Sequence, residues 1–402
     1  MNFPIYLDSQ ATTQVDPRVL EAMLPFFTKS FGNAASLDHS YGSEAAEAVE
    51  KSRQQIARNI NASPKDIIFT SGATESNNIA LLGIATKDPN RNHVITCSTE
   101  VKSVLDTCRH LQNIGKEVTY VSVDDEGKIN LELLEQAITR RTGLITVMTA
   151  NNEVGTIAPI AEIGEIAYKH GVPFHTDAAQ AAGHIPIDVE KMKVDLVSIS
   201  GHKMYGPKGI GVLYFRHDRI DAKPHPLFFG GGHEYGIRSG TLNVPGIVGL
   251  AKAFEIAVKT MDEEKNMFRK WTNYMLNDFK DKAYPVDLNG HPTERLPHNM
   301  NVSFDGVEHK ALLRILRKKL AFSSGSACKT LDVEPSYVIL AMGFSAERAY
   351  TAVRFGVSRF NTEEEIQHAS DLIVQAVKKL RIGVSFVTKT EQKIQIPDKA
   401  IN

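Results

Sequence analysis

The segment SISGHKMYGPKGIG (residues 198–211) places Lys203 between two apolar runs that are typical of neighbouring strands. Lysine is a poor choice for a tight connection between buried strands, because its ammonium is costly to bury unpaired. A lysine held at a strand end can instead bind a carbonyl compound covalently as a Schiff base. Lys203 is therefore a candidate covalent anchor, and the glycines around it would let the backbone pass close to a bound group.

Three further segments place polar groups at the ends of predicted strands. FTSGATESNN (69–78) opens a helix whose N–H groups suit a phosphate, although an ordinary helix cap explains it equally well. HTDAAQAAG (175–183) puts Asp177 after a short strand, where its carboxylate either pairs with a cation or caps a turn. MTANNEVGTI (148–157) places two amides at a third strand end, where turn chemistry is the alternative.

Taken together, these groups fit one cofactor, pyridoxal 5′-phosphate (PLP). A phosphate cradle, an aspartate for a protonated pyridine nitrogen and a lysine further along the chain match PLP bound as a Schiff base. Asp177 would keep the ring protonated, so that it accepts electrons from the substrate α-carbon. Lys203 would hold the cofactor, be displaced by the incoming amine and then move protons. The sequence therefore predicts a PLP site.

The elements that must position these groups alternate between short β-rich runs and helical patterns. The candidate strands are 67–70, 93–96, 118–121, 144–150, 173–176, 196–200 and 210–215, with helices such as 131–139 and 161–170 between them. This alternation predicts an α/β fold with a mostly parallel seven-stranded sheet that is covered on both faces. In such sheets, ligands bind beyond the carboxyl ends of the strands.

A second, smaller α+β domain is predicted after the charged helical stretch 245–282. Its candidate elements are 299–304, helix 308–318, 349–360 and helix 362–380. We expect residues 16–258 to form the large domain, residues 1–15 with 259–382 to form the small one, and residues 383–402 to form a loosely held tail.

The bulk composition excludes several classes of function. The 402 residues include 46 basic and 47 acidic side chains, and a net charge of −1 gives no electrostatic reason to expect direct binding to nucleic acid or to an anionic membrane. No apolar run approaches the ~20 residues needed to span a bilayer. Three scattered cysteines indicate neither a disulfide framework nor a metal site. With no secretory signal at the N-terminus, we expect a cytoplasmic protein.

Longer stretches of the chain resemble the cysteine desulfurases, PLP-dependent proteins of the class V aminotransferase group, in the branch that serves iron–sulfur cluster assembly and nitrogen fixation. The matching motifs are YLDSQATTQVDPRV (6–19), FGNAAS (31–36), FTSGATESNN, NNEVG, HTDAAQ, SGHKMYGPKG, GGGHEYGIRSGTLNV (230–244), SSGSAC (323–328) and VRFGVSRFNTEEEI (353–366). The resemblance implies the PLP-dependent transferase fold of type I, and conversion of L-cysteine to L-alanine.

The resemblance also implies how the cofactor is held. Lys203 forms the Schiff base, Asp177 pairs with the pyridinium nitrogen and Gln180 hydrogen-bonds the phenolic oxygen. The residues implied to hold the phosphate are Thr74, the Ala73 backbone, Ser200 and His202.

The same resemblance assigns the substrate and a second subunit. Asn152 is implied to lie near the ring and the substrate carboxylate, while Arg354 binds that carboxylate through a bidentate pair. Thr241 is implied to reach the phosphate of a neighbouring subunit's cofactor, which requires a homodimer with shared active sites.

Cys328 is the predicted nucleophile. A single cysteine is most often a small buried hydrophobe, but Cys328 follows a serine- and glycine-rich run and precedes a polar one. Such a context favours an exposed thiolate that takes the substrate sulfur as a persulfide and passes it to an acceptor protein. Cys97 and Cys108 lie beside apolar positions, and we interpret both as structural.

Position 101 departs from the family pattern. Where the family has a histidine in a TEHK motif, this chain has TEVK, with Val101 in that place. The family histidine stacks on the cofactor ring and serves in proton transfer, whereas valine can cover the ring but cannot move protons.

Two functions from different classes therefore stay open. The first is a working cysteine desulfurase, which supplies sulfur-acceptor proteins for iron–sulfur clusters, tRNA thiolation or DNA phosphorothioation. The second is a cofactor-binding protein with impaired catalysis that acts as a scaffold or partner. Within the enzymes, a selenocysteine lyase is a further alternative.

Overall fold

The computed structural model describes residues 4–219, 223–324 and 335–391, with side chains described as far as Ile382. Cys328, the predicted nucleophile, lies outside the described residues. None of the described helices combines the length and the apolar character needed to cross a bilayer.

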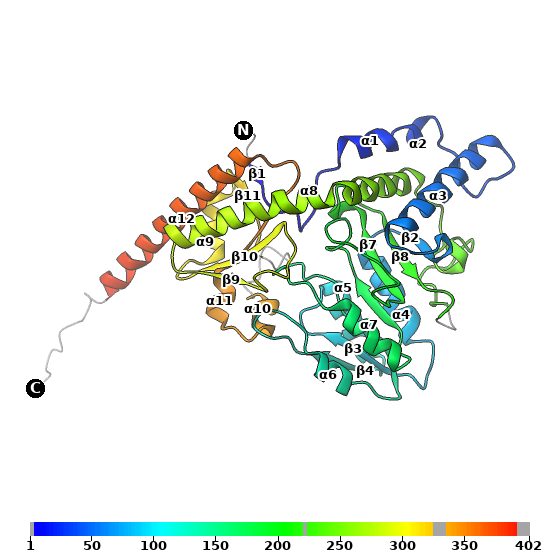
Figure 1. Cartoon of the computed structure of the whole chain (residues 1–402), viewed down its shortest axis with the longest axis horizontal. Helices are drawn as coiled ribbons and strands as arrows, with labels where there is room; N and C mark the ends of the chain where they lie inside the picture. The colour runs from blue at the N-terminus through cyan, green and yellow to red at the C-terminus, as the bar shows by residue number, and fades with distance from the viewer. Residues whose placement is uncertain (1–3, 220–222, 325–334, 392–402) are drawn as a thin grey trace, which may run out of the picture.

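A seven-stranded sheet forms the centre of the larger part of the molecule (Figure 1). Its strand order is β2-β8-β7-β6-β5-β3-β4, and β8 runs antiparallel to both of its neighbours while the other neighbouring strands pair in parallel. The strands are β2 (Ile67–Thr70), β3 (His93–Cys97), β4 (Glu117–Val121), β5 (Thr142–Thr146), β6 (Phe174–Asp177), β7 (Leu196–Ser200) and β8 (Gly211–Phe215). This arrangement confirms the predicted mostly parallel sheet.

One predicted strand ends earlier than the sequence pattern indicated. The run 144–150 is apolar, but β5 ends at Thr146. The backbone N–H of Met148 donates to the buried carboxylate of Glu100 at 2.5 Å rather than to a neighbouring strand. On the other side of the strand, Val147 and Thr149 still donate to the carbonyls of His175 and Asp177, so it is the pairing with β3 that ends at Thr146.

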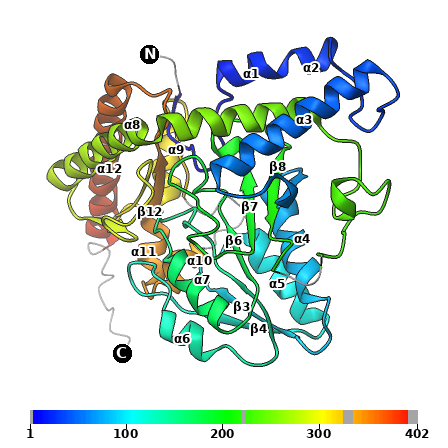
Figure 2. The ribbon, with the colours of Figure 1, turned by 45° about the vertical axis from the view of Figure 1, so that its right-hand side comes forward.

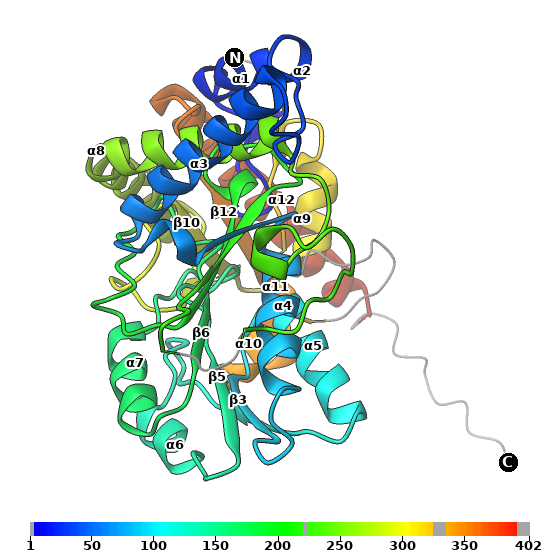
Figure 3. The same ribbon diagram turned by 90° about the vertical axis from the view of Figure 1, so that its right-hand side faces the viewer.

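Helices cover both faces of the sheet because successive side chains of each strand point to opposite faces. In β2, Ile67 and Phe69 join the hydrophobic cluster under α3, α7 and α8, whereas Ile68 joins the cluster under α4 and α5. Figure 3 shows α4 and α5 on one side of the strands and α6 and α7 on the other. These helices are α3 (Ser40–Asn59), α4 (Ala73–Ala85), α5 (Lys102–Asn113), α6 (Leu131–Gln136), α7 (Ile160–Lys169) and α8 (Val244–Lys282).

A smaller α/β part is built on a three-stranded antiparallel sheet of order β12-β10-β9. It has its own hydrophobic cluster, which includes Phe279, Phe304 and Phe355 and also Ile5 and Leu7 from the N-terminal segment. Its elements are β1 (Ile5–Tyr6), β9 (Val286–Asn289), β10 (Asn299–Phe304), α9 (His309–Leu316), β11 (Leu320–Ala321), α10 (Tyr337–Ala341), α11 (Ala346–Thr351), β12 (Ala352–Gly356) and α12 (Glu363–Glu391).

Two connections join the parts. Helix α8 runs from the large part, where it lies beside α3, to the small one (Figure 2). The N-terminal strand β1 pairs in parallel with β11, and the chain then crosses to α1 (Pro17–Met23) and α2 (Pro25–Thr28) of the large part. The predicted domain boundaries, residues 16–258 against 1–15 with 259–382, stay a prediction.

The segment predicted to be a loosely held tail begins as a helix. Helix α12 continues to Glu391, so the backbone of residues 383–391 is helical, and the tail, residues 383–402, stays a prediction. The sequence loses its apolar periodicity there, but backbone hydrogen bonds can extend a helix without an apolar face.

Candidate active site

A cavity of about 520 Å³ opens where β2, β6 and β7 end. Segments that are far apart in the sequence line it, as expected at the carboxyl ends of strands in an α/β sheet. The structure brings together here nearly all of the predicted site residues: Ala73, Thr74, Val101, Asn152, Asp177, Gln180, Ser200, His202, Lys203 and Arg354.

Lys203 stands in a short 3-10 turn, Gly201–Lys203, directly after β7. Its ammonium donates to the backbone carbonyls of Gln10 and, at 2.8 Å, of Ala11. Burial, followed by the positive charge of Arg354, lowers the pKa of Lys203 from 10.5 to about 8, although the carboxylates of Asp177 and Asp8 oppose this shift. The amine is therefore close to the neutral form that attacks carbonyl groups.

Asp177 ends β6 and is buried on the floor of the cavity. Its carboxylate accepts hydrogen bonds from the side-chain amide of Asn77 at 2.7 Å and from the backbone N–H of Ala179 at 2.8 Å. Burial raises the pKa of Asp177, while these two bonds and the charge of Lys203 lower it. A buried carboxylate of this kind favours a cationic partner in the cavity.

The opposite end of the cavity suits an anion. Helix α4 begins there, and its N-cap Gly72 supplies no side chain to the first N–H groups of the helix. Gly211 must lack a side chain, since a Cβ on it would lie 2.6 Å from the Cα of Gly72. His202 bonds the hydroxyl of Thr12 at 3.0 Å, and burial, followed by the charges of Lys203 and Lys208, lowers its pKa to about 4. The ring of His202 is therefore neutral at physiological pH.

Arg354 brings the small part of the molecule into the cavity. It lies on β12, and its Nη1 donates to the carbonyl oxygen of Asn152 at 2.8 Å. Gln180 donates to the carbonyl of Gln10 at 3.0 Å. Among the described residues, the side-chain oxygens of Asn152 and Gln10 are buried without a hydrogen-bond partner. Asn152 lines the cavity, so its oxygen is available to a bound molecule, whereas the Gln10 oxygen packs against Gly356.

Two of the predicted residues are not brought to the cavity. Thr241 is exposed and does not line it. Cys328 lies outside the described residues. The other two cysteines are buried, and burial raises the pKa of Cys97 to about 11 and that of Cys108 to about 12. Neither is a thiolate at neutral pH, which agrees with their interpretation as structural residues.

The residues that sequence reasoning missed lie mainly in the N-terminal segment. Asp8, Gln10 and Ala11 contact Arg354 or Lys203, and Asn77 holds Asp177. Both groups stand inside motifs that the sequence singled out, YLDSQATT and FTSGATESNN, but neither motif reveals which side chain points into a cavity.

Comparisons with known proteins give a consistent result. A sequence profile described as "Aminotransferase class-V" matches residues 5–368. The "Cysteine desulfurase IscS" of Rickettsia felis is 51% identical over 381 residues, which cover 94% of this chain and 92% of that protein. Among solved structures, a "NIFS-LIKE PROTEIN" has a TM-score of 0.86 at 37% identity, covering 96% of this chain and 100% of its own. A structure titled "SspA in complex with cysteine" has a TM-score of 0.78 at 37% identity, with 89% and 99% covered.

The lowered pKa of Lys203 is testable in the cofactor-free protein. Reductive methylation requires a neutral amine, so its rate at Lys203 should be half-maximal near pH 8, well below the usual lysine value of 10.5. Arg354→Gln removes a positive charge that lowers this pKa and should shift the midpoint to higher pH. Asp177→Asn removes a carboxylate that raises it and should shift the midpoint to lower pH. Mass spectrometry of the Lys203 peptide measures both, and shifts in the same direction would contradict this electrostatic account.

Proposed function

The chain belongs to the aminotransferase class-V family and is an enzyme of its cysteine desulfurase group, and we propose that its cavity binds PLP and L-cysteine, with Cys328 as the sulfur acceptor. The overall reaction is balanced: L-cysteine and the Cys328 thiol give L-alanine and a Cys328 persulfide. One observation supports the proposal above all. A lysine amine with a lowered pKa lies in a cavity between a buried carboxylate and a buried guanidinium.

The described residues fit PLP at each of its polar groups. The start of α4, with Ala73 and Thr74, would bind the phosphate together with Ser200 and His202. The buried carboxylate of Asp177 would pair with the ring nitrogen, and Gln180 would bond the phenolic oxygen. When bound, PLP supplies an electron sink that stabilises negative charge at the substrate α-carbon.

The residues of the chain would then bind the substrate and move its protons. Arg354 would receive the α-carboxylate, and Asn152, whose side-chain oxygen has no partner among the described residues, would orient the substrate beside it. Lys203, once free of the cofactor, would take a proton from the α-carbon and later return one. Its pKa of about 8 suits an amine that both accepts and gives up protons near neutral pH.

The residues on either side of the segment that contains Cys328 lie against this site. The backbone of Ser323 exchanges two hydrogen bonds with that of Arg354, at 2.7 and 3.2 Å. Ser336 bonds the buried carboxylate of Glu153, the residue after Asn152. Both contacts support Cys328 as the thiol that takes the substrate sulfur.

A homodimer is part of the proposal. Thr241 is exposed and would bind the phosphate in a partner subunit. Large apolar side chains are exposed in and beside α1 and α2 and in the segment that precedes Thr241 in the sequence, namely Leu20, Leu24, Phe27, Phe31, Phe228 and Phe229. A surface of this kind favours burial against a second copy of the chain. The sulfur would then pass to acceptor proteins, and we propose a cytoplasmic enzyme.

A second candidate function follows from Val101, which precedes α5 and lines the cavity. Its side chain has no group that can accept or donate a proton. His202, which also lines the cavity, is neutral and bonded to Thr12. A protein that binds PLP but turns over slowly, and that acts as a scaffold or partner, is therefore the alternative.

The anchor can be tested by reduction. The purified protein should be yellow, and borohydride should bleach it and fix the cofactor to Lys203, as peptide mapping would show. Lys203→Ala should lower turnover by about 10²–10⁴-fold or more. Lys169→Ala, at an exposed position on α7, is the control and should retain both colour and activity. Reduced cofactor on any other lysine would refute the assignment.

The nucleophile can be tested separately from cofactor binding. Cys328→Ser should still bind PLP and L-cysteine, because neither requires the thiol, yet it should form no protein persulfide. Cys97→Ser and Cys108→Ser serve as matched controls and should remain active, since both thiols are buried and protonated. A persulfide found on Cys97 or Cys108 by mass spectrometry would contradict the proposal.

The effect of Val101 separates the two functions. One positioned acid–base group contributes about 10²–10⁴-fold, so Val101→His should raise kcat by at least about tenfold with little change in cofactor occupancy. Val101→Phe is the control, because phenylalanine covers the ring without moving protons. Rapid-scan spectra after mixing with L-cysteine provide the measurement. Equal rates for the unmodified protein and the Val101→His variant would make the valine neutral and remove the support for the impaired-enzyme alternative.

A further inference from the structure

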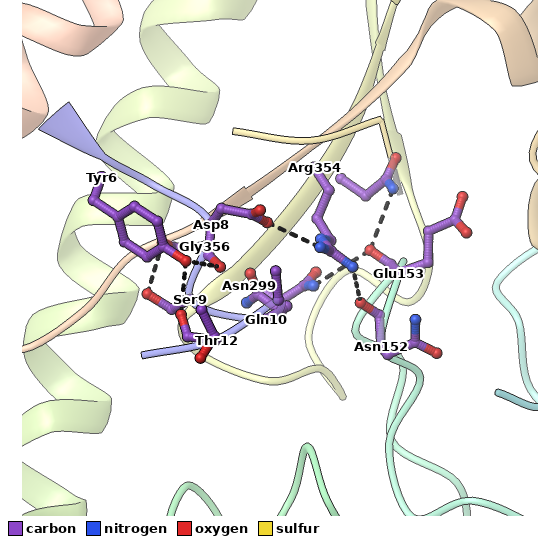
Figure 4. A network of polar contacts seen from close by, with 12 residues as sticks. Tyr6, Asp8, Ser9, Gln10, Thr12, Asn152, Glu153, Asn299, Arg354 and Gly356 are labelled. Carbon is purple, nitrogen blue, oxygen red and sulfur yellow. Dashed lines mark hydrogen bonds and ion pairs between the residues drawn. The ribbon is translucent and has the colours of Figure 1, made fainter. Parts of the chain in front are cut away.

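Arg354, the proposed carboxylate clamp, already holds a carboxylate of its own chain (Figure 4). Its Nη2 donates to the Oδ1 of Asp8 at 2.9 Å, and its Nη1 donates to the carbonyl of Asn152. The side chain of Arg354 is 2% exposed, against 20% for Asp8. Its Nε is buried and has no partner among the described residues. The guanidinium is therefore held in position through its two terminal nitrogens.

The carboxylate of Asp8 belongs to a turn that is itself held in place. The carbonyl of Asp8 accepts the N–H of Ala11 at 2.9 Å and the hydroxyl of Tyr6 at 3.1 Å. Tyr6 also donates to the carbonyl of Thr12 at 2.8 Å. The same turn presents the carbonyls of Gln10 and Ala11 to the Lys203 ammonium. One short segment thus contacts both Lys203 and Arg354.

Asp8 is bonded to a nitrogen of Arg354 that an incoming substrate carboxylate would also use. A bidentate carboxylate bonds two N–H groups on one edge of a guanidinium, either Nη1 with Nη2 or Nε with Nη2. Nη2 belongs to both edges, and Asp8 is bonded to it. A substrate carboxylate on either edge would lie beside the Asp8 carboxylate. Two adjacent negative charges repel each other, so the substrate carboxylate binds less favourably while Asp8 keeps its bond to Nη2.

We propose that Asp8 is an internal competitor for Arg354, which neutralises the guanidinium in the substrate-free enzyme and is displaced by the α-carboxylate of the amino-acid substrate. Asp8 thereby sets the affinity for substrate. The inference rests on the proposed function, in which Arg354 binds that carboxylate. A residue that merely oriented Arg354 would have the opposite effect, because its loss would weaken substrate binding.

The test is a titration of the PLP-loaded enzyme with propionate, followed by ligand-observed NMR. Propionate carries only the carboxylate, and propionamide has the same size without the charge. Asp8→Asn should lower the Kd for propionate by about tenfold, the effect of roughly one pKa unit of charge interaction. The Kd for propionamide should stay the same. An unchanged or raised Kd for propionate in Asp8→Asn would overturn the proposal.

Two further variants distinguish the loss of the Asp8 charge from a loosening of the turn, and test separately whether Arg354 binds the carboxylate. Tyr6→Phe removes a hydroxyl that holds the turn but leaves the charge of Asp8, and it should not change the Kd for propionate. Tightening by Tyr6→Phe equal to that by Asp8→Asn would mean that a loosened turn, not a lost charge, is the cause. Arg354→Gln should abolish propionate binding. If propionate still binds to the Arg354→Gln variant, the proposal that Arg354 binds the substrate carboxylate is wrong. If only Asp8→Asn gives an unexpected Kd, the proposal that Asp8 competes is wrong and the role proposed for Arg354 is unaffected.

A measurement on the unmodified protein covers the case in which Asp8→Asn does not fold. Crystals of the PLP-loaded enzyme soaked with propionate should show its carboxylate on Arg354, with the Asp8 carboxylate moved away from Nη2. Propionate bound to Arg354 while Asp8 keeps its bond to Nη2 would refute the competition.

Discussion

The site depends on one constraint, which is that the side chains of Lys203 and Arg354 must share one cavity. The positive charge of Arg354 adds to burial in lowering the pKa of Lys203, so the lysine is the group that gives up its proton more readily. Arg354 has dedicated oxygen partners, the carboxylate of Asp8 and the carbonyl of Asn152. The different surroundings of the two groups suit the roles proposed for them, Lys203 as a nucleophile and Arg354 as an anion receptor.

The two-part fold supplies these groups from opposite sides. Strands of the large sheet end at Asp177 and just before Lys203, so that the proposed ring partner and the proposed covalent anchor are fixed by neighbouring parallel strands. The small sheet contributes Arg354, which in the proposed function contacts the substrate rather than the cofactor. In the proposed function, the cofactor would be held by the larger sheet, and the substrate carboxylate would be bound by a separate sheet with its own hydrophobic cluster.

The features of the fold and of the site that depend on local sequence pattern could be predicted from the sequence. The apolar run Ile67–Thr70 formed its strand as expected, and the strand ends converged on one cavity because parallel strands place their carboxyl ends on the same edge. The bond between Asp8 and Arg354 joins residues 346 positions apart, and no local pattern encodes such a contact. The end of β5 was misjudged for a related reason, since the carboxylate that takes the Met148 N–H belongs to Glu100, which is remote in the sequence.

The N-terminal turn also has a consequence for synthesis on the ribosome. Residues 5–12 leave the exit tunnel first, yet β1 pairs with Leu320–Ala321 and Asp8 bonds Arg354. The large sheet can assemble as it emerges, because its strands are nearer neighbours along the chain. Strand β1 and Asp8 must instead wait for partners that are made almost last, whereas Gln10 and Ala11 can bond Lys203 earlier. The chain therefore completes the proposed substrate-binding side of its cavity only after translation is nearly complete, because a chain truncated before β12 lacks Arg354.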